Sequence, residues 1–120
     1  MTLSAPQALN LWRVALVESL RQGGPDLTSR QVAVLLTVYL TAPPHTVRGL
    51  AAGLTVSKAA ISRALDRLSQ LELVRRKVDD ADRRSVLVQR TVKGLVFLSD
   101  FADLVVAAER DATGERGPSA

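Results

Sequence analysis

The sequence has 120 residues, of which 47% are hydrophobic, and its 16 Lys and Arg outnumber its 12 Asp and Glu by four. This length favours a single domain, and the apolar share is too high for a chain that is disordered throughout. Because there is no cysteine, disulfides, zinc–thiolate sites and control by thiol oxidation are excluded.

The opening residues, Met1 to Leu9, lack the basic and then apolar pattern of a secretion signal. The runs without a charge are interrupted by Thr or Pro and fall short of the roughly 18 to 20 apolar residues of a membrane span. We therefore expect a cytoplasmic protein without a membrane segment, and nothing in the sequence indicates a cofactor or a metal site.

The positive charge is concentrated in the middle of the chain. Residues 46–94 hold eleven Lys and Arg and five Asp and Glu, a net charge of +6, whereas residues 1–45 carry +1 and residues 95–120 carry −3. A basic block between near-neutral or acidic ends suggests a surface for a polyanion, although charged runs are often only solvated surface.

The first predicted helix spans 7–22 and ends before the breaker Gly23-Gly24-Pro25. Its apolar residues recur at helical spacing, but further apolar side chains lie on its other sides, which is more than one buried stripe requires. The recurring residues are Leu9, Trp12, Leu16 and Leu20.

The second predicted helix begins with a capping box, in which the Thr28 hydroxyl serves the amide of Gln31. The next breaker, 42–45, ends this helix, and His45 beside Pro44 is expected to be a loop residue. The side chains expected to face the core are Val32, Leu35, Leu36, Tyr39 and Leu40.

Two short helices follow, the first from Val47 to about Leu54 with Thr46 as its cap, and the second capped by Ser57. The second helix separates an apolar stripe from a polar face. The stripe consists of Ile61, Ala64, Leu65, Leu68 and Leu71, and the opposite face of Lys58, Ala59, Ser62, Arg63, Asp66 and Arg67.

Residues 73–90 read as two short strands around a polar turn, a charged hairpin. Thr91 then caps a final helix over 92–112, and residues 113–120 are expected to form a flexible tail. The final helix carries one apolar stripe, Leu95, Leu98, Ala102 and Val105, which is widened by Phe97, Phe101, Leu104 and Ala108.

This order of elements predicts a mainly α fold with a small antiparallel β-hairpin: one winged helix-turn-helix domain over 1–112, with the helix-turn-helix at 46–71 and the wing at 73–90. In such folds the second helix of the pair enters the DNA major groove and the hairpin reaches the neighbouring backbone. The residues placed to touch base edges are Ser57, Lys58, Ala59, Ser62 and Arg63.

From about Leu27 to Gly94 the sequence resembles the MarR-type (multiple antibiotic resistance) regulators. The most specific stretches are 56–68, similar to the family's recognition helix, 73–84, similar to its wing, and 91–94, similar to the junction between wing and last helix. The resemblance implies a dimeric transcription regulator, usually a repressor, on a pseudo-palindromic double-stranded operator. It also implies that the terminal helices form the homodimer and that a small anionic or phenolic effector often binds.

Residue roles follow from this resemblance by position. Ser57, Lys58, Ser62 and Arg63 match the recognition-helix face, Arg83 and Arg84 match the wing arginines, of which one enters the minor groove, and Asp82 matches the aspartate that steadies the turn. A narrow minor groove concentrates negative potential, which suits the weakly hydrated guanidinium. The remaining candidates are Thr46, Arg48 and Lys93 for phosphate contacts, Arg67 for DNA, and Leu9, Trp12, Leu16, Leu98, Phe101 and Val105 for the dimer interface.

Other interpretations of these residues stay open. Arg75, Arg76 and Lys77 could only protect a strand edge from aggregation, and Arg67 with Asp66 could be ordinary helix surface charge. The terminal helices could instead dock another protein, which would make the chain an interaction module or an accessory factor without ligand control. An enzyme has no support, because the sequence holds no set of nucleophile and base and no glycine-rich phosphate loop.

One departure from the family concerns the turn before the recognition helix, where the usual glycine is Thr55. If the backbone there has positive φ, a side chain costs on the order of 1 kcal/mol. The short final segment also leads us to expect a dimer surface built mostly from the first and last helices and little room for a large ligand cavity.

Overall fold

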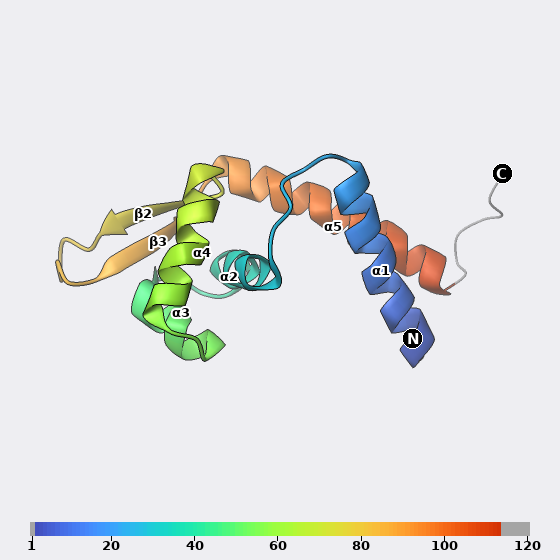
Figure 1. Cartoon of the computed structure of the whole chain (residues 1–120), viewed down its shortest axis with the longest axis horizontal. Helices are drawn as coiled ribbons and strands as arrows, with labels where there is room; N and C mark the ends of the chain where they lie inside the picture. Colours follow the sequence, from blue (N-terminus) through green and yellow to red (C-terminus); the bar gives the residue numbers. More distant parts are fainter. Residues whose placement is uncertain (1, 114–120) are drawn as a thin grey trace. The chain divides into compact units, whose positions relative to one another are not determined.

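The computed structural model describes residues 2–113, which form five α-helices and one small sheet (Figure 1). Thr113, the first residue of the predicted tail, is instead the last residue of the final helix, and residues 114–120 lie outside the described residues. The elements are α1 (Ala5–Arg21), α2 (Ser29–Leu40), β1 (His45–Thr46), α3 (Val47–Leu54), α4 (Lys58–Gln70), β2 (Val74–Val78), β3 (Val86–Arg90) and α5 (Val92–Thr113).

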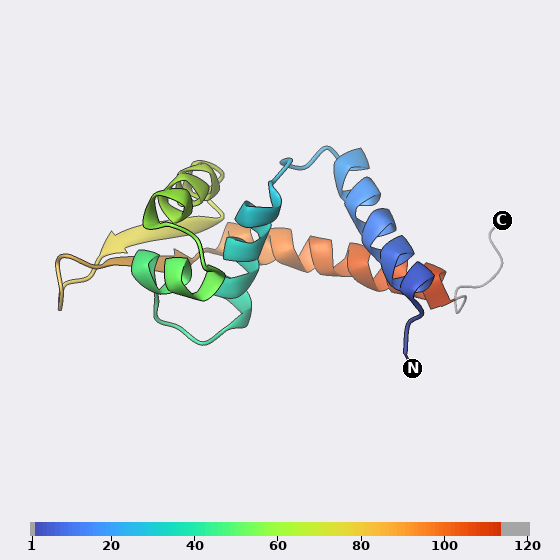
Figure 2. The ribbon, with the colours of Figure 1, turned by 60° about the horizontal axis from the view of Figure 1, so that its bottom comes forward.

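The chain divides into two compact units. The central unit, Leu27–Phe97, contains α2 to β3 and the start of α5, and the terminal unit contains α1 and the rest of α5. In the terminal unit α1 lies beside the C-terminal half of α5 in both views (Figures 1 and 2), and Ala15 and Ala108 are buried.

The central unit is a winged helix-turn-helix: α3 and α4 form the helix pair, and β2 and β3 form a hairpin that projects beyond them (Figure 2). The sheet is antiparallel in the order β1-β3-β2, with Val74 opposite Arg90 at the base of the hairpin and Val78 opposite Val86 near its turn. The predicted fold class is therefore confirmed.

The core of the central unit lies between α2, α3, α4 and the base of the hairpin. Its buried side chains come from every one of these elements: Val34, Leu35, Val38, Leu50, Ala51, Ala60, Ile61, Ala64, Leu65, Leu68, Leu73, Val74 and Val88. The predicted stripe of α4 is confirmed from Ile61 to Leu68, whereas Leu71 is half-buried at the helix end.

Several local predictions need correction. The first helix starts at Ala5 instead of residue 7, because Ser4 and Gln7 form a capping box and Pro6 lies in the first turn. In α2 Leu40 is 75% exposed, and Val34 and Val38 are buried in its place. The near-continuous apolar run from Val32 to Leu36 fits several helical phases, and packing against α3, α4 and β3 selects one of them.

The third correction concerns His45, which is not a loop residue. It forms the two-residue strand β1 with Thr46 and pairs with Val88 of β3. A strand of two residues is too short to show an alternating pattern in the sequence. The final helix also departs from its predicted inward stripe, since Leu95 is 62% exposed.

The backbone of the turn between α3 and α4 has a positive φ at Thr55, which is the case in which a side chain carries a steric cost. Thr55 is left-handed, with φ 57° and ψ 46°, and ends α3 as its C-cap. The amide of Val56 donates to the carbonyl oxygen of Ala51 at 3.0 Å, which closes the helix end. A threonine therefore occupies a conformation that glycine adopts without steric cost.

Candidate nucleic-acid interface

Helix α4 presents one polar face to solvent because its other face is fully used by the core. The Ser57 hydroxyl accepts a hydrogen bond from the amide of Ala60 at 3.0 Å and fixes the helix start, as predicted. Lys58, Ala59 and Arg63 are exposed and Ser62 is half-buried. Thirteen residues give α4 a length of about 20 Å, which matches the span of a few base pairs.

The start of α3 carries two further candidates, Thr46 and Arg48. The Thr46 hydroxyl accepts from the amide of Gly49 at 2.9 Å, so it caps α3 as expected. Arg48 follows in the first turn and is exposed. This position leaves the Arg48 guanidinium available to a ligand outside the helix pair.

The hairpin turn is built around two aspartates. Asp79 and Ser85 close it through the amide of Asp79 and the carbonyl oxygen of Ser85, at 2.9 Å. The Asp82 carboxylate accepts from the amide of Arg84 at 3.1 Å, and its carbonyl oxygen accepts from the amide of Ser85 at 2.8 Å. Asp82 therefore shapes the segment that carries Arg83 and Arg84, whose side chains are exposed.

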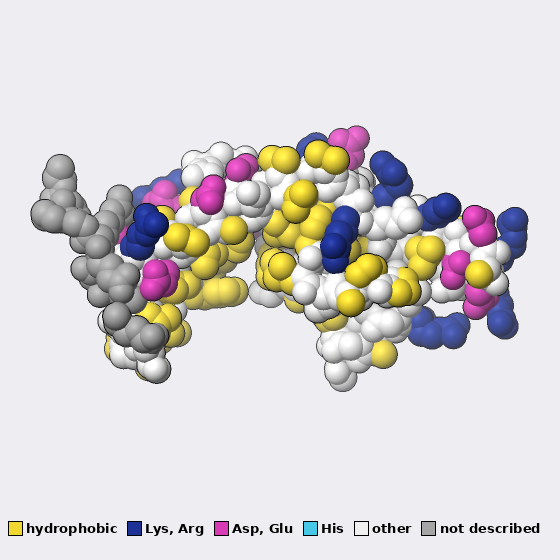
Figure 3. All heavy atoms as spheres, turned by 180° about the vertical axis from the view of Figure 1, so that it is seen from behind, with side chains coloured by type: hydrophobic (Ala, Val, Ile, Leu, Met, Phe, Trp, Pro, Cys, Tyr) yellow, Lys and Arg dark blue, Asp and Glu magenta, His cyan; other side chains and the backbone are white. Residues whose placement is uncertain are grey.

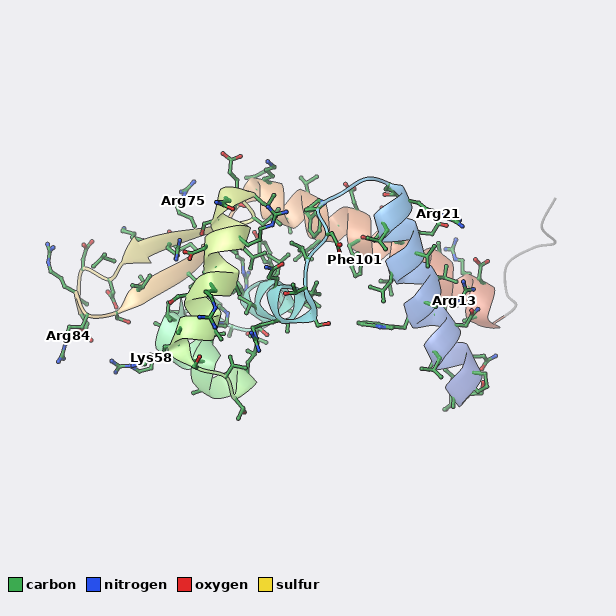
Figure 4. All side chains as sticks on the ribbon, in the orientation of Figure 1. Arg13, Arg21, Lys58, Arg75, Arg84 and Phe101 are labelled. Carbon is green, nitrogen blue, oxygen red and sulfur yellow. The ribbon has the colours of Figure 1, made fainter. Side chains whose placement is uncertain are left out.

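Basic side chains gather around the hairpin, as Figure 3 shows from behind. In Figure 4 Lys58 lies at the start of α4 and Arg84 at the hairpin turn, whereas Arg75 lies near the opposite end of α4. The start of α4 and the hairpin turn are neighbouring parts of the central unit, and both expose cationic side chains.

An ion pair connects the hairpin with α4. Arg76 of β2 lies 2.9 Å from the Asp66 carboxylate on the outer face of α4. Arg76 therefore does more than protect a strand edge, and Asp66 has its partner on the hairpin. A pair this exposed contributes at most about 1 kcal/mol to stability.

Lys93 is not brought together with Lys58 and Arg63. Its Nζ lies 3.4 Å from the Glu72 carboxylate, just beyond the C-terminal end of α4. The length of α4 therefore separates Lys93 from the base-facing candidates at the start of that helix.

Sequence reasoning missed the contacts of Tyr39. It places the tyrosine on the core face, but the hydroxyl makes hydrogen bonds to Leu73 and Thr91, far away in the sequence. A tyrosine hydroxyl that is removed from solvent needs a hydrogen-bond partner. This requirement was the one signal in the sequence, and it does not say which groups supply the partner.

The predicted dimer residues of α1 remain uncovered. Leu9, Trp12 and Leu16 are 72%, 61% and 42% exposed and share one side of the helix. The α5 candidates Leu98, Phe101 and Val105 are half-buried. Large apolar side chains aligned in this way mark an interaction surface more often than chance exposure does.

A family model described as MarR family matches residues 26–85, which is half of the chain. The chain belongs to the MarR family. Its five helices and three-stranded sheet agree with the solved structures of that family, so the resemblance seen in the sequence is confirmed.

The relatives are regulators rather than enzymes. The chain is 29% identical over 87 residues to the HTH-type transcriptional regulator PecS of Dickeya dadantii, an alignment that covers 71% of this chain and 52% of PecS. The chain thus spans about half the length of that curated relative.

Two solved structures are similar over most of the chain. Wild-type MarR from E. coli, in its apo form, is 25% identical, with a TM-score of 0.71 over 92% of this chain and 79% of that one. A mutant of S. aureus MepR bound to an oligodeoxyribonucleotide has a TM-score of 0.77 at 19% identity, over 92% and 78% of the two chains. The second similarity concerns the fold alone.

Every helix within residues 2–113 is too short or too polar to cross a membrane.

Proposed function

We propose that this MarR-family protein is a sequence-specific, double-stranded DNA-binding transcriptional regulator that acts as a homodimer, most simply as a cytoplasmic repressor. The observation that carries the proposal is the outer face of α4, exposed and basic at its start, beside a hairpin turn that exposes two arginines. The opposite face of α4 is completely buried, so the helix can offer DNA only this side.

In the proposed complex α4 lies in the major groove. A B-form major groove admits one helix, and side chains near the helix start reach the base edges. Ser57, Lys58, Ala59, Ser62 and Arg63 occupy those positions. Arg63 is the strongest candidate for reading sequence, because a guanidinium can donate two hydrogen bonds to one guanine.

The hairpin turn is proposed to enter the neighbouring minor groove through Arg83 or Arg84, with Asp82 holding the turn in shape. Phosphate contacts come from Arg48 and the α3 start at Thr46, and Arg67 adds charge on the outer face of α4. Lys93 would reach only flanking phosphates, and only after leaving Glu72. Such contacts fix the register of the protein on DNA without reading its sequence.

A second copy is the proposed occupant of the apolar side of α1. Leu9, Trp12 and Leu16, with Leu98, Phe101 and Val105 of α5, would form an interface with two-fold symmetry. Such a dimer presents two α4 helices and therefore binds a pseudo-palindromic operator with half-sites about one helical turn, or a multiple of it, apart. A small-molecule effector that regulates DNA binding belongs to the same proposal.

A selection from a random duplex pool tests the proposal. We expect enrichment of one site with two-fold symmetry, and a reporter fused to a promoter with that site should be repressed when the protein is expressed. The alternative, an interaction module, predicts no enriched sequence and co-purification of a different chain on the α1 surface.

A further inference from the structure

The side chain of Tyr39, at the end of α2, joins both strands of the hairpin at their base. Its hydroxyl lies 2.7 Å from the carbonyl oxygen of Leu73 and 3.1 Å from that of Thr91, and it accepts a hydrogen bond from the amide of Thr91 at 2.8 Å. Leu73 immediately precedes β2 and Thr91 immediately follows β3. One phenol therefore bridges the two points where the hairpin leaves the helical body.

Arg90 joins the end of β3 to the end of α2, next to the Tyr39 ring. Its guanidinium donates to the carbonyl oxygens of Val38 and Thr41, both at 2.9 Å, and lies 5.9 Å from the centre of the Tyr39 ring. The last carbonyls of a helix have no partner within the helix, so these charge-assisted bonds satisfy the end of α2. The last residue of β3 is thereby bonded to the helix that carries Tyr39.

The start of α5 packs against the same hydroxyl. The Thr91 side chain donates to the carbonyl oxygen of Glu72 at 2.7 Å and accepts from the amide of Gly94 at 2.9 Å. A Cβ at Gly94 would collide with the Tyr39 hydroxyl and the Leu73 carbonyl oxygen. Three segments distant in the sequence therefore meet at one phenol with no spare space.

A small rotation of the hairpin at this junction moves its far end by a larger distance, because the hairpin is long. Each strand has five residues, and at about 3.3 Å per residue the turn lies roughly 16 Å from the base. A tilt of about 10° at the base therefore moves Arg83 and Arg84 by about 3 Å, and shifts of that size break hydrogen bonds.

We infer that Tyr39 is a positioning residue for DNA binding: its hydroxyl sets the direction of the hairpin and thereby the place where Arg83 and Arg84 meet the duplex. The inference rests on the proposed function. Tyr39 itself contacts no DNA in this arrangement, and its effect passes only through the hairpin.

A double-mutant cycle on the full chain tests this route. Tyr39→Phe removes only the hydroxyl and should weaken binding to the selected duplex about fivefold. In a background that already carries Arg83→Ala and Arg84→Ala it should weaken binding no further, whereas in an Arg63→Ala background the fivefold loss should persist. Val34→Ala is the control: it removes a buried side chain of α2 that makes none of these hydrogen bonds, so it should lower thermal stability but leave affinity unchanged.

Hydrogen exchange on the free protein supplies a second readout that needs no DNA. In Tyr39→Phe the amides of 74–90 should exchange faster while those of α4 keep their protection, and Val34→Ala should not reproduce this pattern. Equal losses of affinity with and without the hairpin arginines, or unchanged exchange in the hairpin, would overturn the inference. If the wild-type chain binds no duplex, the proposed function fails, and the exchange experiment still decides the role of Tyr39.

Discussion

The outer face of α4 carries both a residue that pairs with the hairpin and residues that have no partner in the described part of the chain. Asp66 is paired with Arg76 of the hairpin, while among the described residues no hydrogen bond or ion pair engages the side chains of Lys58 and Arg63. A guanidinium without an internal partner can approach a base edge without first breaking a contact. A substitution at Arg63 is therefore the sharpest test of the proposed sequence recognition.

Arg63→Ala should therefore cost about 1 to 3 kcal/mol of binding free energy and relax the preference for one base pair in each half-site. The measurement is a titration against the selected duplex and its single-base variants. Arg13→Ala removes the same charge from α1 and should change neither affinity nor preference. An Arg63→Ala variant that keeps full sequence discrimination would refute the assignment.

A substitution at Thr55 tests whether the backbone of the turn between α3 and α4 is strained. Because it is held at φ 57°, Thr55→Gly should stabilise the protein by about 1 kcal/mol, seen as a higher melting temperature. The comparison is Ala52→Gly, which lies inside α3 and should destabilise by a similar amount. A Thr55→Gly variant that melts below the wild type would show that the left-handed turn carries no strain.

At the scale of elements, the sequence predicts the caps of α2 to α5 correctly because a cap depends on neighbours three residues apart, although the Ser4–Gln7 capping box of α1 is missed. Thr28, Thr46, Ser57 and Thr91 all accept the expected amide hydrogen bonds. Contacts between distant segments leave no such local signature. Arg90 reaches Val38 across 52 positions, and neither its type nor its neighbours indicate this.

The same reason limits the predicted burial of apolar side chains. The α4 stripe alternates cleanly with polar residues and is placed correctly, whereas α2 is apolar over several adjacent positions and its phase is set only by tertiary packing. The DNA-facing candidates follow from the α4 pattern and the family resemblance, and the junction at Tyr39 does not.

A substitution at Gly94 tests the packing at the Tyr39 junction, where α5 begins. Gly94→Ala should destabilise the protein by about 1 to 3 kcal/mol, because its Cβ has no room between Tyr39 and Leu73. Gly53→Ala, in open space on α3, should instead stabilise by about 0.5 to 1 kcal/mol. Chemical denaturation of the two variants measures both signs, and equal effects would argue against the crowded junction.

At the scale of the whole molecule, the uncovered side of α1 is the feature that the isolated chain leaves unexplained. Leu9, Trp12, Leu16 and Leu20 present apolar surface that water solvates poorly. In the proposed homodimer a second copy would cover this surface and would also duplicate α4, so that dimer formation would raise the affinity for a symmetric site.

Trp12→Ala combined with Leu16→Ala should therefore convert the protein from dimer to monomer at micromolar concentration, because central aromatic contacts dominate interface energies. Sedimentation velocity measures the change. Leu40→Ala removes an apolar side chain exposed outside the proposed interface and should leave the dimer intact. A wild-type monomer, or a double variant that remains dimeric, contradicts the proposed interface.

The most direct test of the central proposal is the salt dependence of binding to the selected duplex and to a scrambled duplex of equal composition, followed by fluorescence anisotropy. If about six phosphates are neutralised per dimer, the logarithm of the binding constant should fall with the logarithm of salt concentration at a slope of roughly −5. The selected duplex should bind more tightly at every salt concentration. Binding that ignores salt, or that is equal for the two duplexes, would contradict a sequence-specific DNA-binding regulator.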